Sequence, residues 1–206
     1  MSGISIIGLG DMARTLGTRA IKGGNAVEVI GRDQAKAAAL ARALGGGATT
    51  GTFGAVPTGD VVVLAVPYPS AVPIVSRYGN ALAGKVIVDI TNPFAPGATE
   101  LLTPDGVSAT RQIAEAAPAG AHVVKAFNTV FGHVLAGDRR LDVLIAGDDA
   151  EAKALVSEFI TSIGLRPLDT GSSRMARGLE ETGLLMMGLG RHGVRHHDFA
   201  FGVAHP

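Results

Sequence analysis

Short apolar runs alternate with Ala-rich amphipathic runs over the first 140 residues of the chain. "ISII", "AVEVI", "DVVVLAV" and "KVIVDI" have the length of strands, and the last two are nearly all apolar, as strands buried on both faces are. Helical patterns follow them, first over 11–22 and 33–44 and then in "SAVPIVSRYG" and "ATRQIAEAA". "HVVKAF" reads as a further strand. This alternation predicts an α/β fold, a Rossmann-type doubly wound parallel sheet with helices on both faces.

The pattern repeats in smaller form after about residue 140. "LDVLIAG" predicts a strand, "DDAEAKALVSEFITSIG" a helix, "LRPLDTG" a short extended piece and "RMARGLEETGLLMMGLG" a last helix. We therefore expect a Rossmann domain over 1–140 and a small C-terminal α/β extension over 141–206 that forms the substrate cleft and dimer contacts. The Gly-rich stretches 45–47 and "TTGTFGAVPTGD" are expected to be loops.

One face of the last predicted helix carries apolar side chains at helical spacing. They are Met175, Leu179, Met186 and Leu189. Such a stripe is typical of a core or a subunit interface rather than of a ligand site.

Composition removes several classes of chemistry. The 206 residues include no cysteine, which excludes disulfides, thiolate catalysis and Cys-based metal sites. Lys and Arg total 18 and balance 18 Asp and Glu, so the net charge gives no case for nucleic acid or an anionic membrane as partner. The N-terminal run has no basic region and no long apolar stretch. We expect a cytoplasmic protein without signal peptide or transmembrane helix.

A glycine-rich turn follows the first predicted strand. "IIGLGDMA" places Gly8, Gly10 and Ala13 in the G-x-G-x-x-[G/A] pattern between a strand and a helix, with a second strand on schedule. Gly8 permits the tight turn, Gly10 removes a Cβ that would block a diphosphate, and Ala13 allows close packing of helix on strand. The N–H groups of the helix start then bind the diphosphate of a dinucleotide.

The second predicted strand contains an acid at the position that counting would select for the adenosine ribose. Glu28 lies 20 residues after Gly8. It also lies three residues before Gly31, roughly 10 Å at about 3.3 Å per residue. We therefore expect Glu28 along the strand rather than at its end.

At the end of this strand the residue types favour NADP over NAD. Gly31 has no side chain to compete for the 2′-position, and the planar cation of Arg32 suits a phosphate. Lys36, one helical turn later, can add charge. Asp33 either caps the following helix or binds the ribose itself.

Polar side chains at the other strand exits are candidates for chemistry, because ligands bind outside the carboxyl ends of parallel strands. They are Tyr68, Asn92, Lys125, Asn128 and Thr129. Asn92 either shapes the turn before Pro93 or binds the cofactor. Asn128 either caps a loop or presents its amide to a nicotinamide carboxamide or a substrate carbonyl. Lys125 is either a paired structural charge or a proton donor to a reduced C=N or C=C bond.

The tail "GRHGVRHHDFAFGVAHP" holds four of the six histidines. These are His192, His196, His197 and His205. His192 and His196 have the spacing of a helical zinc site, but the glycines of the segment disfavour a helix and no carboxylate-rich frame accompanies it. We expect no metal, and read the tail as a polar lip over the substrate pocket or as solvated surface.

Several stretches together resemble one family, the deazaflavin-dependent (coenzyme F-420) NADP reductases. More loosely, they resemble the NADPH-binding reductase domain of six-transmembrane metalloreductases. The stretches are "IIGLGDMARTLG", "GRD", "VVVLAVPY", "HVVKAFNTV", "AGDDAEAKALVSEFITSIGLRPLDTG" and "RMARGLEETGLLMMGL". The positions that match NADP-binding residues of the family are Gly8, Leu9, Gly10, Asp11, Met12, Arg32, Ala65, Val66 and Pro67.

The resemblance implies an NADP-dependent oxidoreductase with direct hydride transfer between NADP(H) and coenzyme F-420, the deazaflavin stacking on the nicotinamide between the domains, and a homodimer. Two alternatives stay open. One is an NADPH-dependent reductase of a small organic C=N, C=C or C=O substrate, which would need a proton donor. The other is a non-catalytic NADP-binding protein.

Overall fold

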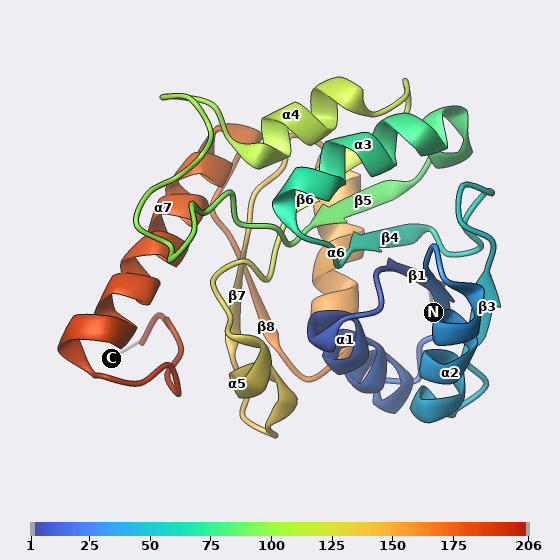
Figure 1. Cartoon of the computed structure of the whole chain (residues 1–206), viewed down its shortest axis with the longest axis horizontal. Coiled ribbons are helices and arrows are strands. Elements are labelled where there is room, and N and C mark those ends of the chain that lie inside the picture. Colours follow the sequence, from blue (N-terminus) through green and yellow to red (C-terminus); the bar gives the residue numbers. More distant parts are fainter. Residues whose placement is uncertain (1–2, 205–206) are drawn as a thin grey trace.

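Six parallel strands form the main sheet of the molecule (Figure 1). The structure, a computed structural model, describes residues 3–204. The strand order is β3-β2-β1-β4-β5-β6, and a separate two-stranded parallel sheet pairs β7 with β8. The strands are β1 (Ile4–Ile7), β2 (Val27–Ile30), β3 (Thr49–Gly51), β4 (Val61–Leu64), β5 (Val86–Asp89), β6 (His122–Lys125), β7 (Asp142–Ile145) and β8 (Arg166–Asp169). This order is that of the Rossmann fold, so the predicted fold class is confirmed.

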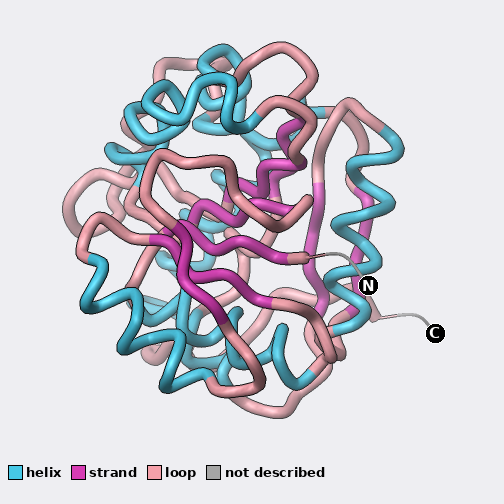
Figure 2. The backbone as a smooth tube through the Cα atoms, turned by 90° about the vertical axis from the view of Figure 1, so that its right-hand side faces the viewer, coloured by secondary structure: helices cyan, strands magenta, loops and turns pink. Residues whose placement is uncertain are grey.

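Helices cover both faces of the main sheet (Figure 2). They are α1 (Asp11–Lys22), α2 (Gln34–Leu44), α3 (Tyr68–Tyr78), α4 (Ala109–Ala116), α5 (Gly132–Ala136), α6 (Ala150–Ser162) and α7 (Ala176–Gly188), with short turns η1 (Gly79–Leu82), η2 (Ser173–Met175) and η3 (Leu189–Gly193). Val61 and Val63 of β4 join a core with α1, α2 and α6, whereas Val62 and Leu64 join a core with α3, η1 and α4. This alternation along one buried strand produces the two hydrophobic layers.

The C-terminal segment continues the same core. The backbones of Lys125 and Ala146 form an antiparallel bridge, with N···O distances of 2.8 and 3.1 Å, which sets β7 beside β6. Val143, Val156 and Phe159 of this segment belong to the same buried cluster as α1. The hydrophobic core is continuous across residue 140 and so does not mark a boundary between two domains there. The division of the chain at residue 140 stays a prediction.

The apolar stripe predicted for the last helix is buried only in part. Leu179 and Met186 are 4% and 3% exposed, whereas Met175 and Leu189 are 45% and 46% exposed. The chain after η3 forms no helix or strand up to residue 204, and its Val203 N–H donates to Asp142 at 2.7 Å. No helix of residues 3–204 has the length and apolarity needed to cross a lipid bilayer.

One expected loop is partly a strand. Residues 49–51 of the "TTGTFGAVPTGD" stretch form β3, which pairs with β2 at the sheet edge, so the loop prediction was wrong there. A Cβ on Gly51 would lie 2.6 Å from the Glu28 carboxylate, which explains a glycine in a strand. Three residues with one glycine are too short for a periodic pattern to reveal.

Candidate functional site

The turn between β1 and α1 is shaped by two glycines with different constraints. Gly8 has φ of +138°, and a Cβ there would lie 2.0 Å from the carbonyl oxygen of Ala65. Gly10 has no heavy atom within 4 Å of the position of a Cβ. No side chain caps α1 at Gly10, so the first-turn N–H groups keep their hydrogen-bonding capacity for a ligand. Ala13 is buried beneath this turn, as close packing of α1 on the sheet requires.

Glu28 lies within β2 and does not reach the end of the strand. Its carboxylate accepts hydrogen bonds from the Ser5 hydroxyl at 2.6 Å and from the Thr58 N–H at 2.9 Å. The residue is buried. Glu28 therefore lies along the strand, as expected from the strand geometry, and not at the position that counting from Gly8 would select.

The end of β2 presents a cation. Gly31 lies against Leu9, because a Cβ at Gly31 would come within 2.5 Å of the Leu9 side chain. The Asp33 carboxylate accepts a hydrogen bond from the Lys36 N–H at 3.0 Å and so caps α2. Capping is therefore the one of its two predicted roles that the geometry favours. Arg32 is exposed and has no ion pair with any carboxylate of the described residues.

A cavity of about 450 Å³ joins these features at the strand exits. It opens into a hollow of about 690 Å³ that shares Gly31, Arg32 and Phe53 with it. We call the two together the strand-exit groove. Predicted cofactor residues that line it are Gly8, Leu9, Gly10, Gly31, Arg32, Asp33, Lys36, Ala65, Val66 and Pro67.

The groove also contains residues that the sequence analysis missed. Phe53, Ser70 and Ile74 line both hollows, and Arg77 lines the larger one. The Arg77 guanidinium lies over the Phe53 ring, 5.6 Å from its centroid. Phe53 follows β3, so its position at a strand exit became visible only once β3 was identified.

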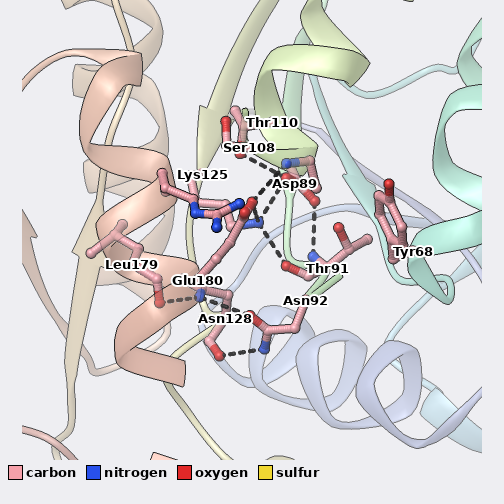
Figure 3. A network of polar contacts seen from close by, with 12 residues as sticks. Tyr68, Asp89, Thr91, Asn92, Ser108, Thr110, Lys125, Asn128, Leu179 and Glu180 are labelled. Atoms are coloured by element: carbon pink, nitrogen blue, oxygen red, sulfur yellow. Dashed lines mark hydrogen bonds and ion pairs between the residues drawn. The ribbon is translucent and has the colours of Figure 1, made fainter. Parts of the chain in front are cut away.

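A second, smaller pocket of about 200 Å³ lies where α7 crosses the exits of β5 and β6. We call it the amide pocket, because Asn92 and Asn128 line it (Figure 3). Asn128 Nδ2 donates to Asn92 Oδ1 at 3.0 Å and to the Leu179 carbonyl at 2.8 Å, and Asn92 Nδ2 donates to the Asn128 carbonyl at 2.8 Å. Asn128 Oδ1 is buried and has no hydrogen-bond partner among residues 3–204. The rest of the lining is mostly apolar, with Met12, Ile90, Phe94, Phe127, Phe131, Met186 and Met187 among its members.

The strand exit before Asn128 has a strained backbone. Phe127 has φ of +60° although it is not a glycine, and its side chain is 1% exposed. Its ring packs edge-on against Phe159, with centroids 6.2 Å apart. Left-handed backbone at a bulky residue persists only where packing enforces it, and such residues concentrate at binding sites.

Lys125 lies behind the amide pocket and is fully buried. Its ammonium donates to Asp89 at 2.9 Å, to the Thr91 carbonyl at 2.6 Å and to Glu180 at 2.9 Å (Figure 3). An ammonium has three N–H bonds, and all three are therefore used within the protein. This geometry favours the paired structural charge over the proton donor. Asp89 and Glu180 were not identified from the sequence, in which they are 91 residues apart.

The remaining strand-exit candidates separate into two places. The Tyr68 hydroxyl is directed to α4, where it bonds Gln112 Oε1 at 2.9 Å, and it lines neither the strand-exit groove nor the amide pocket. Thr129 is buried and lines the amide pocket.

The tail lies beside the amide pocket. His197 packs edge-on against Phe131, with ring centroids 5.3 Å apart, and Phe131 lines that pocket. His192 and His196 are exposed, and His205 lies outside the described residues. Within residues 3–204, no group of three or more His, Cys, Asp or Glu side chains is placed to hold a metal ion.

The fold and this groove together define a Rossmann-type α/β protein with the geometry of a dinucleotide site. Residues 3–93 match a family model described as NADP oxidoreductase coenzyme F420-dependent. The chain is 32% identical over 140 residues to the F420-dependent NADP reductase of Methanocaldococcus jannaschii, a match that covers 64% of this chain and 62% of that enzyme. It is 28% identical over 201 residues to the enzyme of the same name from Methanothermobacter marburgensis, covering 88% and 89% of the two chains.

A longer protein also matches. The chain is 35% identical over 187 residues to the metalloreductase STEAP3 of Rattus norvegicus, which covers 89% of this chain and 37% of that protein. The chain thus spans less than two thirds of this relative and of the M. jannaschii enzyme.

Solved structures agree with this similarity. A candidate F420-dependent NADP reductase of Arthrobacter sp. fb24 is 25% identical, with a TM-score of 0.87 over 100% of both chains. A hypothetical protein from Sinorhizobium meliloti is 29% identical, with a TM-score of 0.77 over 86% of this chain and 88% of that one. The predicted resemblance to the deazaflavin-dependent NADP reductases is confirmed.

Proposed function

We propose that the protein is an NADPH-dependent oxidoreductase that transfers hydride directly between NADP(H) and a deazaflavin of the coenzyme F420 type. The observation that carries this proposal is the cation at the end of β2. Arg32 shares one cavity with the glycine turn and has no carboxylate partner among residues 3–204. An unpaired guanidinium beside a diphosphate site is suited to the 2′-phosphate that distinguishes NADP from NAD.

The residues present fit a dinucleotide along the strand exits. The open space above Gly10 and the uncapped start of α1 suit the diphosphate, because the N–H groups and the helix dipole favour an anion there. Lys36 and Arg32 line the same cavity for the 2′-phosphate. Asn128 Oδ1 in the amide pocket is a free acceptor for the N–H groups of a nicotinamide carboxamide.

The proposed reaction matches the chemistry that the site offers. Bound NADPH supplies the hydride, and transfer between two rings requires proximity and orientation rather than a proton donor. The Lys125 ammonium has no hydrogen left for a substrate. The role of the chain is to bind the nicotinamide, to orient it through Asn128 and to exclude water with the apolar lining of the amide pocket.

The domain organisation, the oligomeric state and the location of the protein belong to the same proposal. We propose a Rossmann domain over 1–140 with an extension over 141–206, and a homodimer that works in the cytoplasm. Leu185 on α7 and Leu189 at the start of η3 are 63% and 46% exposed, which supports a subunit contact at this end of the helix. Light scattering after size-exclusion chromatography measures the mass that a dimer requires.

Cofactor binding tests the carrying observation. In calorimetric titrations we expect Arg32→Ala to weaken NADPH binding by about tenfold or more, because a charge-assisted hydrogen bond contributes about 1.5–3 kcal/mol. NADH binding should stay unchanged. Arg42→Ala is the matched control, since Arg42 is exposed near the far end of α2, the helix that follows Arg32. Equal NADPH affinity in Arg32→Ala and in Arg42→Ala would contradict the proposal.

Turnover tests the acceptor. When the protein is mixed with NADPH and oxidised coenzyme F420, the absorbance of both reactants should fall. The amounts of NADPH and of oxidised deazaflavin consumed should be equal in moles. NADPH binding without loss of deazaflavin absorbance would overturn the proposed acceptor and point to a small organic substrate or to a non-catalytic role.

A further inference from the structure

Three fully buried charged side chains meet behind the amide pocket. Asp89 of β5, Lys125 of β6 and Glu180 of α7 each have 0% exposure, and the ammonium lies 2.9 Å from an oxygen of each carboxylate (Figure 3). We call these three residues the buried triad. Two carboxylates share one ammonium, so the triad carries an excess negative charge when both are ionised.

Neutral donors stabilise both carboxylates. Asp89 also accepts from the Thr91 N–H and the Thr110 hydroxyl, each at 2.8 Å. Glu180 Oε1 also accepts from the Ala109 N–H at 3.0 Å, at the start of α4, where a helix favours an anion. Glu180 Oε2 is buried and accepts no hydrogen bond from the described part of the chain. Burying ions costs several kcal/mol each, and perturbed buried charges concentrate at functional sites.

The buried triad adjoins the wall of the amide pocket. Ile90, which follows Asp89, lines the pocket, and so does Gly183, one turn of α7 after Glu180. Three residues of a helix span about 4.5 Å along its axis. Along α7 the Glu180 carboxylate is therefore about one helical turn, roughly 5 Å, from the wall of the pocket.

We propose that the buried triad stabilises the positively charged oxidised nicotinamide ring and thereby makes bound NADPH a stronger hydride donor. This inference rests on the proposed function. When the neutral dihydronicotinamide gives up a hydride, two electrons and one proton leave together for the acceptor ring, and the nicotinamide becomes a cation. A fixed negative charge behind it stabilises the product of that step and has little effect on the neutral reactant.

The effect has a defined size and a defined readout. Unit charges about 8 Å apart, at an effective dielectric constant of about 20, interact strongly enough to change an equilibrium by about tenfold or more. NADP+ and NADPH differ chemically only at the nicotinamide ring. The ratio of their dissociation constants, Kd of NADP+ over Kd of NADPH, therefore isolates the charge on the ring.

Glu180→Gln tests the inference, because it removes the charge while keeping the size and an acceptor oxygen. Because burial raises the pKa of Glu180, calorimetry is done at about pH 8, well above the usual carboxylate pKa of about 4.3. It should show the ratio rising by about tenfold, mainly through weaker NADP+ binding. Glu181→Gln is the matched control. Glu181 is the next residue, is exposed and pairs with Arg177, so its variant should keep the wild-type ratio.

Other outcomes are equally decisive. A Glu180→Gln ratio within twofold of the wild type, or a loss of affinity shared equally by NADP+ and NADPH, overturns the inference, because a merely structural role affects both forms alike. Asp89→Asn removes the other carboxylate charge on a different element and should raise the ratio in the same direction, so the test survives poor folding of one variant. If wild-type protein binds neither form, the proposed function fails instead.

Discussion

At the scale of the residue, Asn128 has one polar atom left for a ligand. Its Nδ2 has two carbonyl partners, Asn92 Oδ1 and the Leu179 backbone, which also fixes the orientation of the amide. Oδ1 is buried, and none of the residues that the structure describes donates to it. Of the roles that the sequence left open, presenting an N–H to a substrate carbonyl would break an existing bond. Accepting from a nicotinamide carboxamide would complete the set.

Asn128→Ala should therefore affect only ligands that contain the nicotinamide. We expect NADPH binding to weaken by about tenfold, since one hydrogen bond is lost and its partner is left buried. Adenosine 2′,5′-bisphosphate, which lacks the nicotinamide, should bind as it does to the wild type. Titration of both ligands against Asn128→Ala and against the exposed control Asn80→Ala measures this. Equal weakening of both ligands would instead indicate a general loss of structure.

Single residues could be predicted from sequence where their role is local. The capping of α2 by Asp33 and the confinement of Glu28 to its strand follow from positions relative to one strand end. The sequence suggested that Lys125 is a paired charge, but it did not identify the partners Asp89 and Glu180, which come from other elements. A charge pair across 55 residues leaves no periodic or spacing signal in a single sequence.

At the scale of the element, the turn from β1 to α1 should separate folding from binding. We expect Gly8→Ala to destabilise the protein, because its φ is +138° and the new Cβ would overlap the Ala65 carbonyl. Gly10→Ala should fold with nearly wild-type stability, since nothing lies within 4 Å of its Cβ. Its methyl group would occupy the space of the diphosphate, and NADPH binding should weaken by about tenfold or more.

Urea unfolding and NADPH titration of the two variants check this contrast. Gly47→Ala is a stability control for a positive-φ glycine with open space around its Cβ, and it isolates backbone strain from overlap. Wild-type NADPH affinity in Gly10→Ala would show that the diphosphate does not lie over this turn.

The elements themselves were predictable in proportion to their length and burial. α1 runs over the predicted 11–22, and the buried strands β4 and β5 lie within the predicted apolar runs. β3 and α5 have three and five residues, and neither has enough length for a pattern to be distinguished from a loop. The loss of β3 from the prediction also hid Phe53 and the wider half of the strand-exit groove.

At the scale of the whole molecule, the alternation of strands and helices predicts the sheet, because parallel strands need crossovers and crossovers are right-handed. The amide pocket depends on how α7 lies across the strand exits. Gly183 permits that approach, since a Cβ there would come within 3.1 Å of Asn92 Oδ1. A helix pattern predicts that α7 exists but not which strand exits it crosses, so the amide pocket emerges only in three dimensions.

The buried triad should also make the stability of the whole molecule depend on pH. Burial raises the pKa of Glu180 above its usual value of 4.5, and the opposing effects of Lys125 and the Ala109 N–H do not cancel it. The folded protein therefore holds this proton more tightly than the unfolded chain does. The resulting stabilisation is fully present below the usual pKa and is lost as pH rises through the raised one.

Urea unfolding from about pH 4 to pH 8 measures this for wild type and Glu180→Gln. The pKa of Asp148 is lowered by its hydrogen bonds to Ser173, and the pKa of Asp169 is lowered because the hydrogen bonds from Lys153 and Gly171 outweigh its burial. Both groups make the protein more stable as pH rises, and they do so equally in the wild type and in Glu180→Gln. The difference between the two free energies of unfolding therefore isolates Glu180. We expect Glu180→Gln to gain stability relative to the wild type as pH rises. Parallel curves would mean that the pKa of Glu180 is the same in the folded and the unfolded chain. A gain that levels off below about pH 8 would mean that the wild-type carboxylate is ionised there in the folded protein, which is the state that stabilises a cationic nicotinamide.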